Sequence, residues 1–299
     1  MTRCMRALGF ADLPGWDADD HAAAWAAFSV TCPHCPDAIS DPRAWFEAHF
    51  TPDEIAPGAA HYTGYYEPEL LGAMTPSPRY SHPLYAPPPR LAAQLPWHDR
   101  ARIMADNLLA GHELVWLQSA IEAFLVQVQG SVRVRLAEGG ILRLGFAAGN
   151  GQPYRSIGAE LVNRGAISAA EISSNAICAW CAANPAQVQD LLNHNPSFVF
   201  FHPLDLPEDT GPLGAMGAPV TAQRSLAVDP AYVPLGIPVW VDCPGIAPRL
   251  MVAQDTGSAI KGAGRGDIFC GTGDVARAQA NGLNTTGRMI VLRPRKALP

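Results

Sequence analysis

The sequence predicts a mainly β protein with peripheral helices, in which a small closed barrel occupies the C-terminal part. Hydrophobic residues make up 48% of the 299 residues and charged residues 16%, which is typical of a folded protein. The 28 prolines and 27 glycines favour turns and strands over a helical bundle. Between residues 212 and 299, short apolar or alternating runs are separated by glycine and proline. Roughly six such strands suit a small barrel better than an open doubly wound sheet.

Two short helices are expected near the N-terminus. The first is "DADDHAAAWAAFSV", which follows Asp17, and the second is "DPRAWFEAHF", with Asp41 as N-cap and Pro42 at the first helical position. The apolar faces of these helices carry Trp25, Phe28, Phe46 and Phe50.

The central region has mixed character. "HYTGYYEPEL" alternates like a strand, and the proline-rich "TPSPRYSHPLYAPPPR" after it forbids a helix and marks a domain boundary. "AFLVQVQGSVRVRLAEGGILRLGFAAGNGQPY" alternates with glycine and asparagine turns, as hairpin strands do. Helices are expected to follow, before "NPSFVFF" returns the chain to strand.

Three helix starts can be read from capping residues. A capping box from Ser168 to Glu171 opens a helix with Ile172, Ala176 and Trp180 on its apolar face. The other two starts are Asn184, followed by Pro185, and Asp274, whose helix ends at Gly282.

The seven cysteines include two CxxC pairs, Cys32 with Cys35 and Cys178 with Cys181. Two such pairs can form a four-thiolate zinc site, and one pair can be a redox centre. Cys178 and Cys181 fall inside a predicted helix, on the side away from its apolar face. Because a zinc knuckle needs a tight turn, we favour accidental spacing there and expect no metal.

Several classes of function are excluded. A net charge of −6 offers no basic surface for nucleic acid. No apolar run approaches the roughly 20 residues of a membrane helix. From "MTRCMRALGFADLPGW" we expect no signal peptide within these residues and no lipid attachment at Cys4, and an export signal can still precede them.

The stretch "AQDTGSAIKGAGRGDIFCG" carries the first candidate catalytic residues, Asp255 and Asp267. Asp-Thr-Gly is used by aspartic proteases, which need two carboxylates that share a proton, and we keep the protease only as a minority interpretation. Asp267 ends a glycine-rich loop, where the backbone can approach a ligand. Burial beside Ile268 and Phe269 would raise the pKa of Asp267 toward that of a general acid, whereas Lys261 or Arg265 would lower it. The alternative is that Asp267 only caps turn amides.

Six collinear blocks resemble the membrane-bound lytic murein transglycosylase A family, and the resemblance extends from about residue 9 to residue 293. They are "HYTGYYEPEL", "QVQGSVRV", "NGQPYRSIGAELVNRGAIS", "NPSFVFF", "GAPVTAQRSLAVDPAYVPLGIPVWVD" and "AQDTGSAIKGAGRGDIFCG". The resemblance implies cleavage of the β-1,4 bond between N-acetylmuramic acid and N-acetylglucosamine in peptidoglycan, leaving a 1,6-anhydromuramoyl end. It also implies a discontinuous double-psi β-barrel domain (residues 1–67 and 199–299), an inserted β-rich α+β domain (residues 68–198) and a sugar groove between them.

By motif, the resemblance assigns Asp267 as the catalytic residue and Asp255 as a supporting one. A single carboxylate can suffice because the sugar's own 6-hydroxyl replaces water as the attacking group, whereas ordinary glycosidases need two carboxylates. We expect Thr63, Tyr65, Tyr66, Gln129 and Lys261 to contact the sugar. One of the two tyrosines can equally pack in the core, and Gln129 can stabilise a turn.

No cofactor is expected. The expected partners are peptidoglycan glycan strands and proteins of cell-wall synthesis or division, and we expect a monomer. The substrate implies the periplasm, with outer-membrane association as in many family members. The alternatives are a glycosidase that uses Asp267 with Asp255 or Glu67, a non-catalytic glycan-binding module and, last, the protease.

Overall fold

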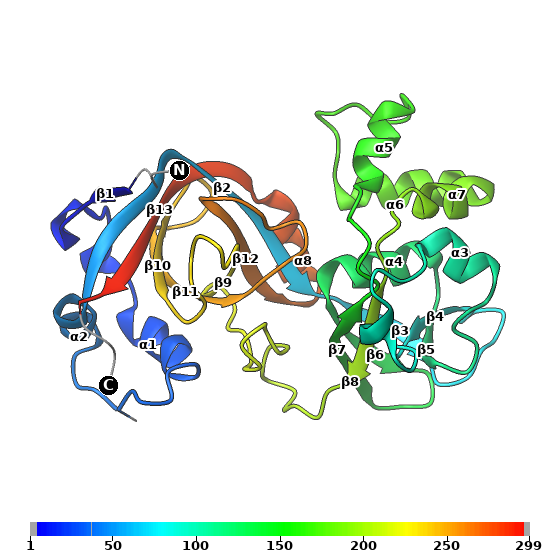
Figure 1. Ribbon diagram of the computed structural model, residues 1–299, viewed down its shortest axis with the longest axis horizontal. Coiled ribbons are helices and arrows are strands. Elements are labelled where there is room, and N and C mark those ends of the chain that lie inside the picture. The colour runs from blue at the N-terminus through cyan, green and yellow to red at the C-terminus, as the bar shows by residue number, and fades with distance from the viewer. Residues whose placement is uncertain (1–4, 37, 296–299) are drawn as a thin grey trace. The chain divides into compact units, whose positions relative to one another are not determined.

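The computed structural model describes residues 5–36 and 38–295, and Cys4 lies outside them. The chain divides into two compact units (Figure 1): residues 1–66 with 207–299, and residues 67–206. The second boundary differs from the predicted one after residue 198. Strand β8 (Val199–Pro203) pairs with β7 (Ile141–Gly149), so its hydrogen bonds place it in the second unit.

The first unit is a closed barrel. Its strands are β1 (Met5–Ala7), β2 (Phe50–Glu67), β9 (Ser225–Val228), β10 (Pro238–Asp242), β11 (Arg249–Asp255), β12 (Arg265–Thr272) and β13 (Asn284–Pro294). Within the described residues they form one sheet of order β1-β2-β12-β9-β11-β10-β13, and an additional β2–β13 pairing closes it into six strands, with β1 beside β2. This confirms the small closed barrel that the sequence predicts.

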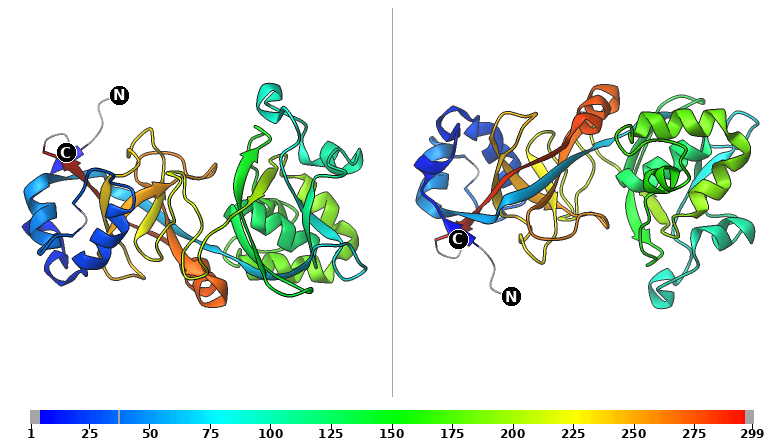
Figure 2. Two further views of the ribbon diagram at one scale, coloured as in Figure 1. Left: turned by 90° about the horizontal axis from the view of Figure 1, so that it is seen from below. Right: turned by 90° about the horizontal axis from the view of Figure 1, so that it is seen from above.

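Strand alternation separates the inside of the barrel from its outer cover. Val239 and Val241 belong to the interior cluster, and Trp240 between them belongs to the cluster on the outer face. That outer cluster includes the aromatic residues of α1 (His21–Ser29) and α2 (Pro42–His49), shown in blue beside the barrel in Figure 2. The N-terminal helices therefore cover an apolar outer surface of the barrel.

Capping explains where these peripheral helices begin. The Asp41 carboxylate accepts a hydrogen bond from the amide of Ala44, as predicted for α2. The first helix was expected directly after Asp17, but α1 begins at His21 with Asp20 as its N-cap, and for α8 (Gly273–Gly282) the N-cap is Thr272 rather than Asp274. Both sequence predictions missed the boundary by a few residues, and the helices themselves are present.

The second unit contains a six-stranded sheet, counted over its described residues, of order β4-β5-β3-β6-β7-β8. The strands not yet given are β3 (Glu69–Ala73), β4 (His82–Tyr85), β5 (Glu113–Leu117) and β6 (Ser131–Leu136). Its helices are α3 (Arg100–Ala105), α4 (Ala120–Gln129), α5 (Ile157–Asn163), α6 (Ser174–Ala183) and α7 (Val188–Asn193). The short 3-10 turn Pro185–Gln187, with Asn184 as its N-cap, leads into α7.

Two predictions in this unit were wrong. "AFLVQVQ" belongs to helix α4 rather than to a strand, because the Ser119 hydroxyl caps its start and Gly130 adopts a left-handed conformation at its end. Helix α6 begins at Ser174, where Ser173 is the N-cap, so the Ser168–Glu171 pair only closes a turn outside the helix.

Candidate active site

Asp255 and Asp267 lie on the two strands that flank β9. Asp255 ends β11 and Asp267 lies near the start of β12, and both are in register with Ala227 of β9. Strands are about 4.8 Å apart, so the two Cα atoms are separated by roughly 10 Å. The fold therefore brings both acidic residues of the sequence motif to one region of the barrel wall.

Strand β2 supplies a hydroxyl group to each carboxylate. The Thr63 hydroxyl donates a hydrogen bond to Oδ1 of Asp267, and the Tyr65 hydroxyl donates to Oδ2 of Asp255 at 2.8 Å. Thr63 and Tyr65 are two residues apart and so share one face of the strand. Tyr62 and Tyr66 are buried in the barrel interior. The repeated aromatic pattern of "HYTGYYEPEL" thus separates into a core face and a site face.

Asp267 has the electrostatics of a general acid. Burial raises the pKa of Asp267 to about 6, and the negative charge of Asp255 acts in the same direction. The Thr63 hydrogen bond, Arg265 and His61 oppose this rise. Oδ2 of Asp267 receives no hydrogen bond from residues 5–36 and 38–295. Both protonation states of Asp267 are therefore populated near neutral pH.

Asp255 is held differently. Its Oδ2 accepts from Tyr65, and its Oδ1 accepts from the backbone amides of Ala215 (3.0 Å) and Thr256 (2.8 Å). Burial raises the pKa of Asp255, and these three hydrogen bonds counteract the rise. The pKa of Tyr65 lies well above its usual value because of burial and the adjacent Asp255 charge. Tyr65 thus stays a neutral donor to Asp255.

Arg265 completes the network. Its Nη2 donates to the Thr63 hydroxyl oxygen at 2.7 Å, and its Nη1 donates to the backbone carbonyl of Gly266 at 2.5 Å. His61 lies two residues before Thr63, and its Nε2 contacts Oδ1 of Asn284 at 2.8 Å. The sequence analysis expected Arg265 only as a nearby charge that lowers the pKa of Asp267, and it assigned no role to His61, although His61 shares the alternation of Thr63 and Tyr65.

Two glycines allow the site strands to pack closely. A Cβ atom on Gly64 would lie 2.7 Å from the Cα of Ala280 in α8, and one on Gly266 would lie 2.7 Å from the ring of Tyr62. Any larger residue at these positions would push α8 or the Tyr62 ring away. The glycines therefore hold β2 and β12 at the separation that the Thr63–Asp267 hydrogen bond needs.

The remaining predicted residues lie elsewhere. Tyr66 is 9% exposed and packs in the barrel interior, the role that the strand pattern allows for one of the two tyrosines. Lys261 is exposed in the loop between β11 and β12. Gln129 ends helix α4 in the second unit, and Glu67 is fully buried there, paired with Arg133 and Arg143.

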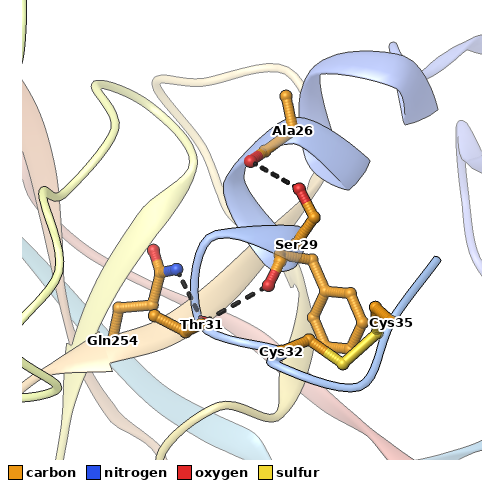
Figure 3. Close-up of a disulfide and its surroundings, with 7 residues drawn as sticks. Ala26, Ser29, Thr31, Cys32, Cys35 and Gln254 are labelled. Carbon is orange, nitrogen blue, oxygen red and sulfur yellow. Dashed lines mark hydrogen bonds between the residues drawn. A yellow bond between two sulfur atoms is a disulfide. The ribbon is translucent and has the colours of Figure 1, made fainter. Parts of the chain in front are cut away.

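The two CxxC pairs behave differently. Cys32 and Cys35 form a disulfide close to Thr31 and Gln254 (Figure 3). Cys178 and Cys181 on α6 are not joined by a disulfide, and both pack in the helical apolar cluster, so the prediction that they lie off the apolar face was wrong. Over the described part of the chain, no three His, Cys, Asp or Glu side chains are grouped as a metal site. No helix within that part is long and apolar enough to cross a bilayer.

Comparison with known proteins assigns both units to families. Residues 61–202 match the MltA specific insert domain, and residues 224–293 match the 3D domain. A membrane-bound lytic murein transglycosylase from Agrobacterium tumefaciens has a crystal structure with a TM-score of 0.88 and 30% identity, covering 97% of this chain and 98% of that one.

The chain belongs to the MltA family of lytic transglycosylases.

It is a homologue of lytic murein transglycosylase A, an enzyme. Membrane-bound lytic murein transglycosylase A of Escherichia coli K12 is 34% identical over 249 residues, which are 79% of this chain and 66% of that protein. The chain thus spans just under two thirds of that relative's length. The crystal structure of E. coli MltA with bound chitohexaose matches with a TM-score of 0.82 and 28% identity, over 99% of this chain and 96% of that one.

Proposed function

We propose that this member of the MltA family is a peptidoglycan lytic transglycosylase with Asp267 as its catalytic residue. It would cleave the β-1,4 bond between N-acetylmuramic acid and N-acetylglucosamine and leave a 1,6-anhydromuramoyl end. The observation that carries the proposal is the Asp267 carboxyl, which combines a pKa of about 6 with an Oδ2 atom that no described residue engages.

In this mechanism one carboxyl serves as acid and then as base. Asp267 gives its proton from Oδ2 to the glycosidic oxygen, and the bond from that oxygen to C1 of the muramoyl residue breaks. The 6-hydroxyl of the same sugar attacks C1 of the oxocarbenium-like species, and the Asp267 carboxylate takes the proton of that hydroxyl. Water is not consumed and Asp267 returns to its starting state. A pKa near 6 suits both steps.

The structure favours this mechanism over a two-carboxylate glycosidase because the other two candidate carboxylates are occupied. Both oxygens of Asp255 accept hydrogen bonds, three in all, from Tyr65 and from two backbone amides. Both oxygens of Glu67 bind arginines, and its side chain is fully buried. Neither carboxylate is free to attack a sugar or activate water. We assign to Asp255 the role of raising the pKa of Asp267.

We propose that the barrel unit is catalytic and that the inserted unit binds substrate. The ligand would be a peptidoglycan glycan strand, a proposal supported by the chitohexaose bound to the E. coli relative. Lys261 and Gln129 are proposed to contact the sugar, whereas Thr63 and Tyr65 orient the two carboxylates. The relatives are named as membrane-bound enzymes. We propose that this protein is a periplasmic, membrane-associated monomer that works with cell-wall synthesis or division proteins.

Mass analysis of muropeptides tests the proposal. Purified sacculi are digested with the protein, and the soluble fragments are weighed. Products that lack one water per cleavage support transglycosylation. Products with reducing ends would show a glycosidase instead, and retention on sacculi without soluble products would show a glycan-binding module.

A further inference from the structure

Arg265 reaches from β12 to β2 and contacts the residue that binds the catalytic carboxyl. Its Nη2 lies 2.7 Å from the Thr63 hydroxyl oxygen, and its Nη1 donates to the carbonyls of Gly266 (2.5 Å) and His61 (3.4 Å). The guanidinium is half-buried and faces the negative charge of Asp267. It is therefore fixed by two backbone carbonyls on adjacent strands and directed at Thr63.

The protons of this network can be assigned from the chemistry of its members. A guanidinium only donates hydrogen bonds, so the oxygen of Thr63 must accept from Arg265. A threonine hydroxyl has one proton, and Thr63 donates that proton to Oδ1 of Asp267. Because Oδ1 already receives this proton, the protonated form of Asp267 carries its own proton on Oδ2.

We propose that Arg265 is a positioning residue for the transglycosylase reaction: by fixing the direction of the Thr63 hydroxyl, it keeps the acid proton of Asp267 on Oδ2. The inference rests on the proposed function of Asp267. Without Arg265, the Thr63 hydroxyl can turn and accept a hydrogen bond from Oδ1–H of Asp267. The acid proton would then bind Thr63 instead of the leaving oxygen.

The charges around Asp267 give the proposal a second readout. Arg265 on β12, together with the Thr63 hydrogen bond and His61 on β2, lowers the pKa of Asp267, and Asp255 on β11 raises it. Tyr65 on β2 and Cys270 on β12 are the other titratable groups coupled to Asp267. Removing the Arg265 charge therefore moves the pKa of Asp267 upward. The alkaline limb of the activity profile, where the acid form is lost, should move the same way.

The test measures kcat and KM against pH on solubilised glycan strands for the complete chain. Arg265→Met removes every donor, and Arg265→Lys keeps one charged donor. Arg6→Met, which removes an exposed arginine of strand β1 in the same unit, is the matched control.

We expect Arg265→Met to lower kcat by about 10- to 100-fold, a part of the 10²–10⁴-fold typical of general acid catalysis. Its KM should stay within about twofold, its alkaline limb should move to higher pH, and Arg265→Lys should restore most of kcat.

Thr63→Val provides the second arm, because it removes the hydroxyl that Arg265 directs and leaves Arg265 in place. If Arg265 acts through the Thr63 hydroxyl, the double variant is nearly as active as Thr63→Val alone. The inference is overturned if Arg265→Met keeps the native kcat and alkaline limb, or if Arg265→Lys restores none of the lost kcat. It is also overturned if the effects of Thr63→Val and Arg265→Met on kcat multiply in the double variant. Native digests with reducing ends would refute the proposed function itself. Anhydromuramoyl products together with a normal Arg265→Met variant would refute only this inference.

Discussion

Asp255 and Asp267 lie opposite the same residue, Ala227, one on each side of strand β9. This shared register gives the two carboxyls different surroundings. Asp255 accepts hydrogen bonds from Tyr65 and two backbone amides, and Asp267 keeps Oδ2 free of described donors. Burial raises the pKa of Asp267, and the negative charge of Asp255 adds to that rise. One carboxyl therefore prepares the other for proton transfer, and the sharpest predictions concern this pair.

Asp267→Asn should abolish glycan cleavage while leaving glycan binding intact. Asparagine keeps the shape of the side chain and can accept the Thr63 hydrogen bond, but it cannot deliver an acid proton. We expect a loss of at least about 10²-fold in kcat, the lower range for general acid catalysis. Release of muropeptides and co-sedimentation with sacculi measure the two properties. The matched control is Asp274→Asn, which changes an exposed aspartate of α8 and should cleave normally. Full activity of Asp267→Asn would remove Asp267 from the mechanism.

Asp255→Asn should shift the alkaline limb of kcat/KM to lower pH. The charge of Asp255 raises the pKa of Asp267, so its removal lowers that pKa and the acid form is lost earlier as pH increases. This shift is opposite in direction to the one expected for Arg265→Met, so each variant serves as a control for the other. The measurement is the pH dependence of kcat/KM for both variants. An unchanged limb in Asp255→Asn would mean that the two carboxyls are not coupled.

Strand alternation made the barrel predictable from the sequence. Val239, Trp240 and Val241 alternate between the interior and the helix-covered outer face, so their period of two shows directly in the sequence. The same rule failed at "AFLVQVQ", whose local alternation looked like a strand. A short apolar run of this kind is compatible with a helix and with a strand. Here the Ser119 N-cap and Gly130 at the C-terminal end favour the helix. Helix α6 shows the same limit, because Ser168 and Ser173 are both suitable caps, and the structure has Ser173 as the cap, accepting a hydrogen bond from the amide of Ala176.

The site was predictable in its carboxylates but not in its network. The glycine-rich loop before Asp267 is visible locally. The bond from Thr63 to Asp267 joins residues 204 positions apart, and the closure of the barrel sets its register. Arg265 was expected only as a charge that lowers the pKa of Asp267. The contact between Arg265 and Thr63 depends on which face of β2 points toward the Arg265 side chain. A shift of one residue in the strand register would turn Thr63 to the opposite face.

Glu67→Gln should destabilise the fold rather than remove the chemistry. Glu67 binds Arg133 at 2.6 Å and Arg143 at 3.2 Å, and breaking such a buried pair costs about 3–5 kcal/mol of unfolding free energy. Glu69→Gln is the control, because its ion pair with Arg135 is exposed and contributes about 1 kcal/mol or less. Urea unfolding gives the stabilities, and the activity of the folded fraction is measured alongside. A stable but inactive Glu67→Gln variant would instead support the two-carboxylate glycosidase.

The Cys32–Cys35 disulfide should contribute modestly to stability. It closes a short loop, for which chain entropy predicts about 2 kcal/mol or less. Thr31, next to this loop, receives a 3.0 Å hydrogen bond from the buried Gln254 of β11 (Figure 3). Dithiothreitol should therefore lower the melting temperature of the native protein by a few degrees. The double variant Cys32→Ser and Cys35→Ser should melt at that lower temperature with or without reductant. An equal effect of reductant on both proteins would exclude the disulfide as its cause.

Asp267→Asn should also stabilise the protein, in a pH-dependent way. The folded-state pKa of Asp267 is raised from 3.8 to about 6, so the folded protein holds this proton more tightly than the unfolded chain does. Well below pH 3.8 both states are protonated and the residue has no net effect. As pH rises from about 4 to about 6, the unfolded chain ionises first and native stability falls; above that the penalty is constant.

One pKa unit corresponds to about 1.4 kcal/mol, and partial exposure of Asp267 reduces the total to on the order of 1–2 kcal/mol. Asparagine lacks this ionisation, so the stability gain of Asp267→Asn over the native protein should grow between pH 4 and pH 7 and then level off. Urea unfolding at several pH values measures that gain, and a difference independent of pH would contradict the raised pKa on which the catalytic role of Asp267 rests.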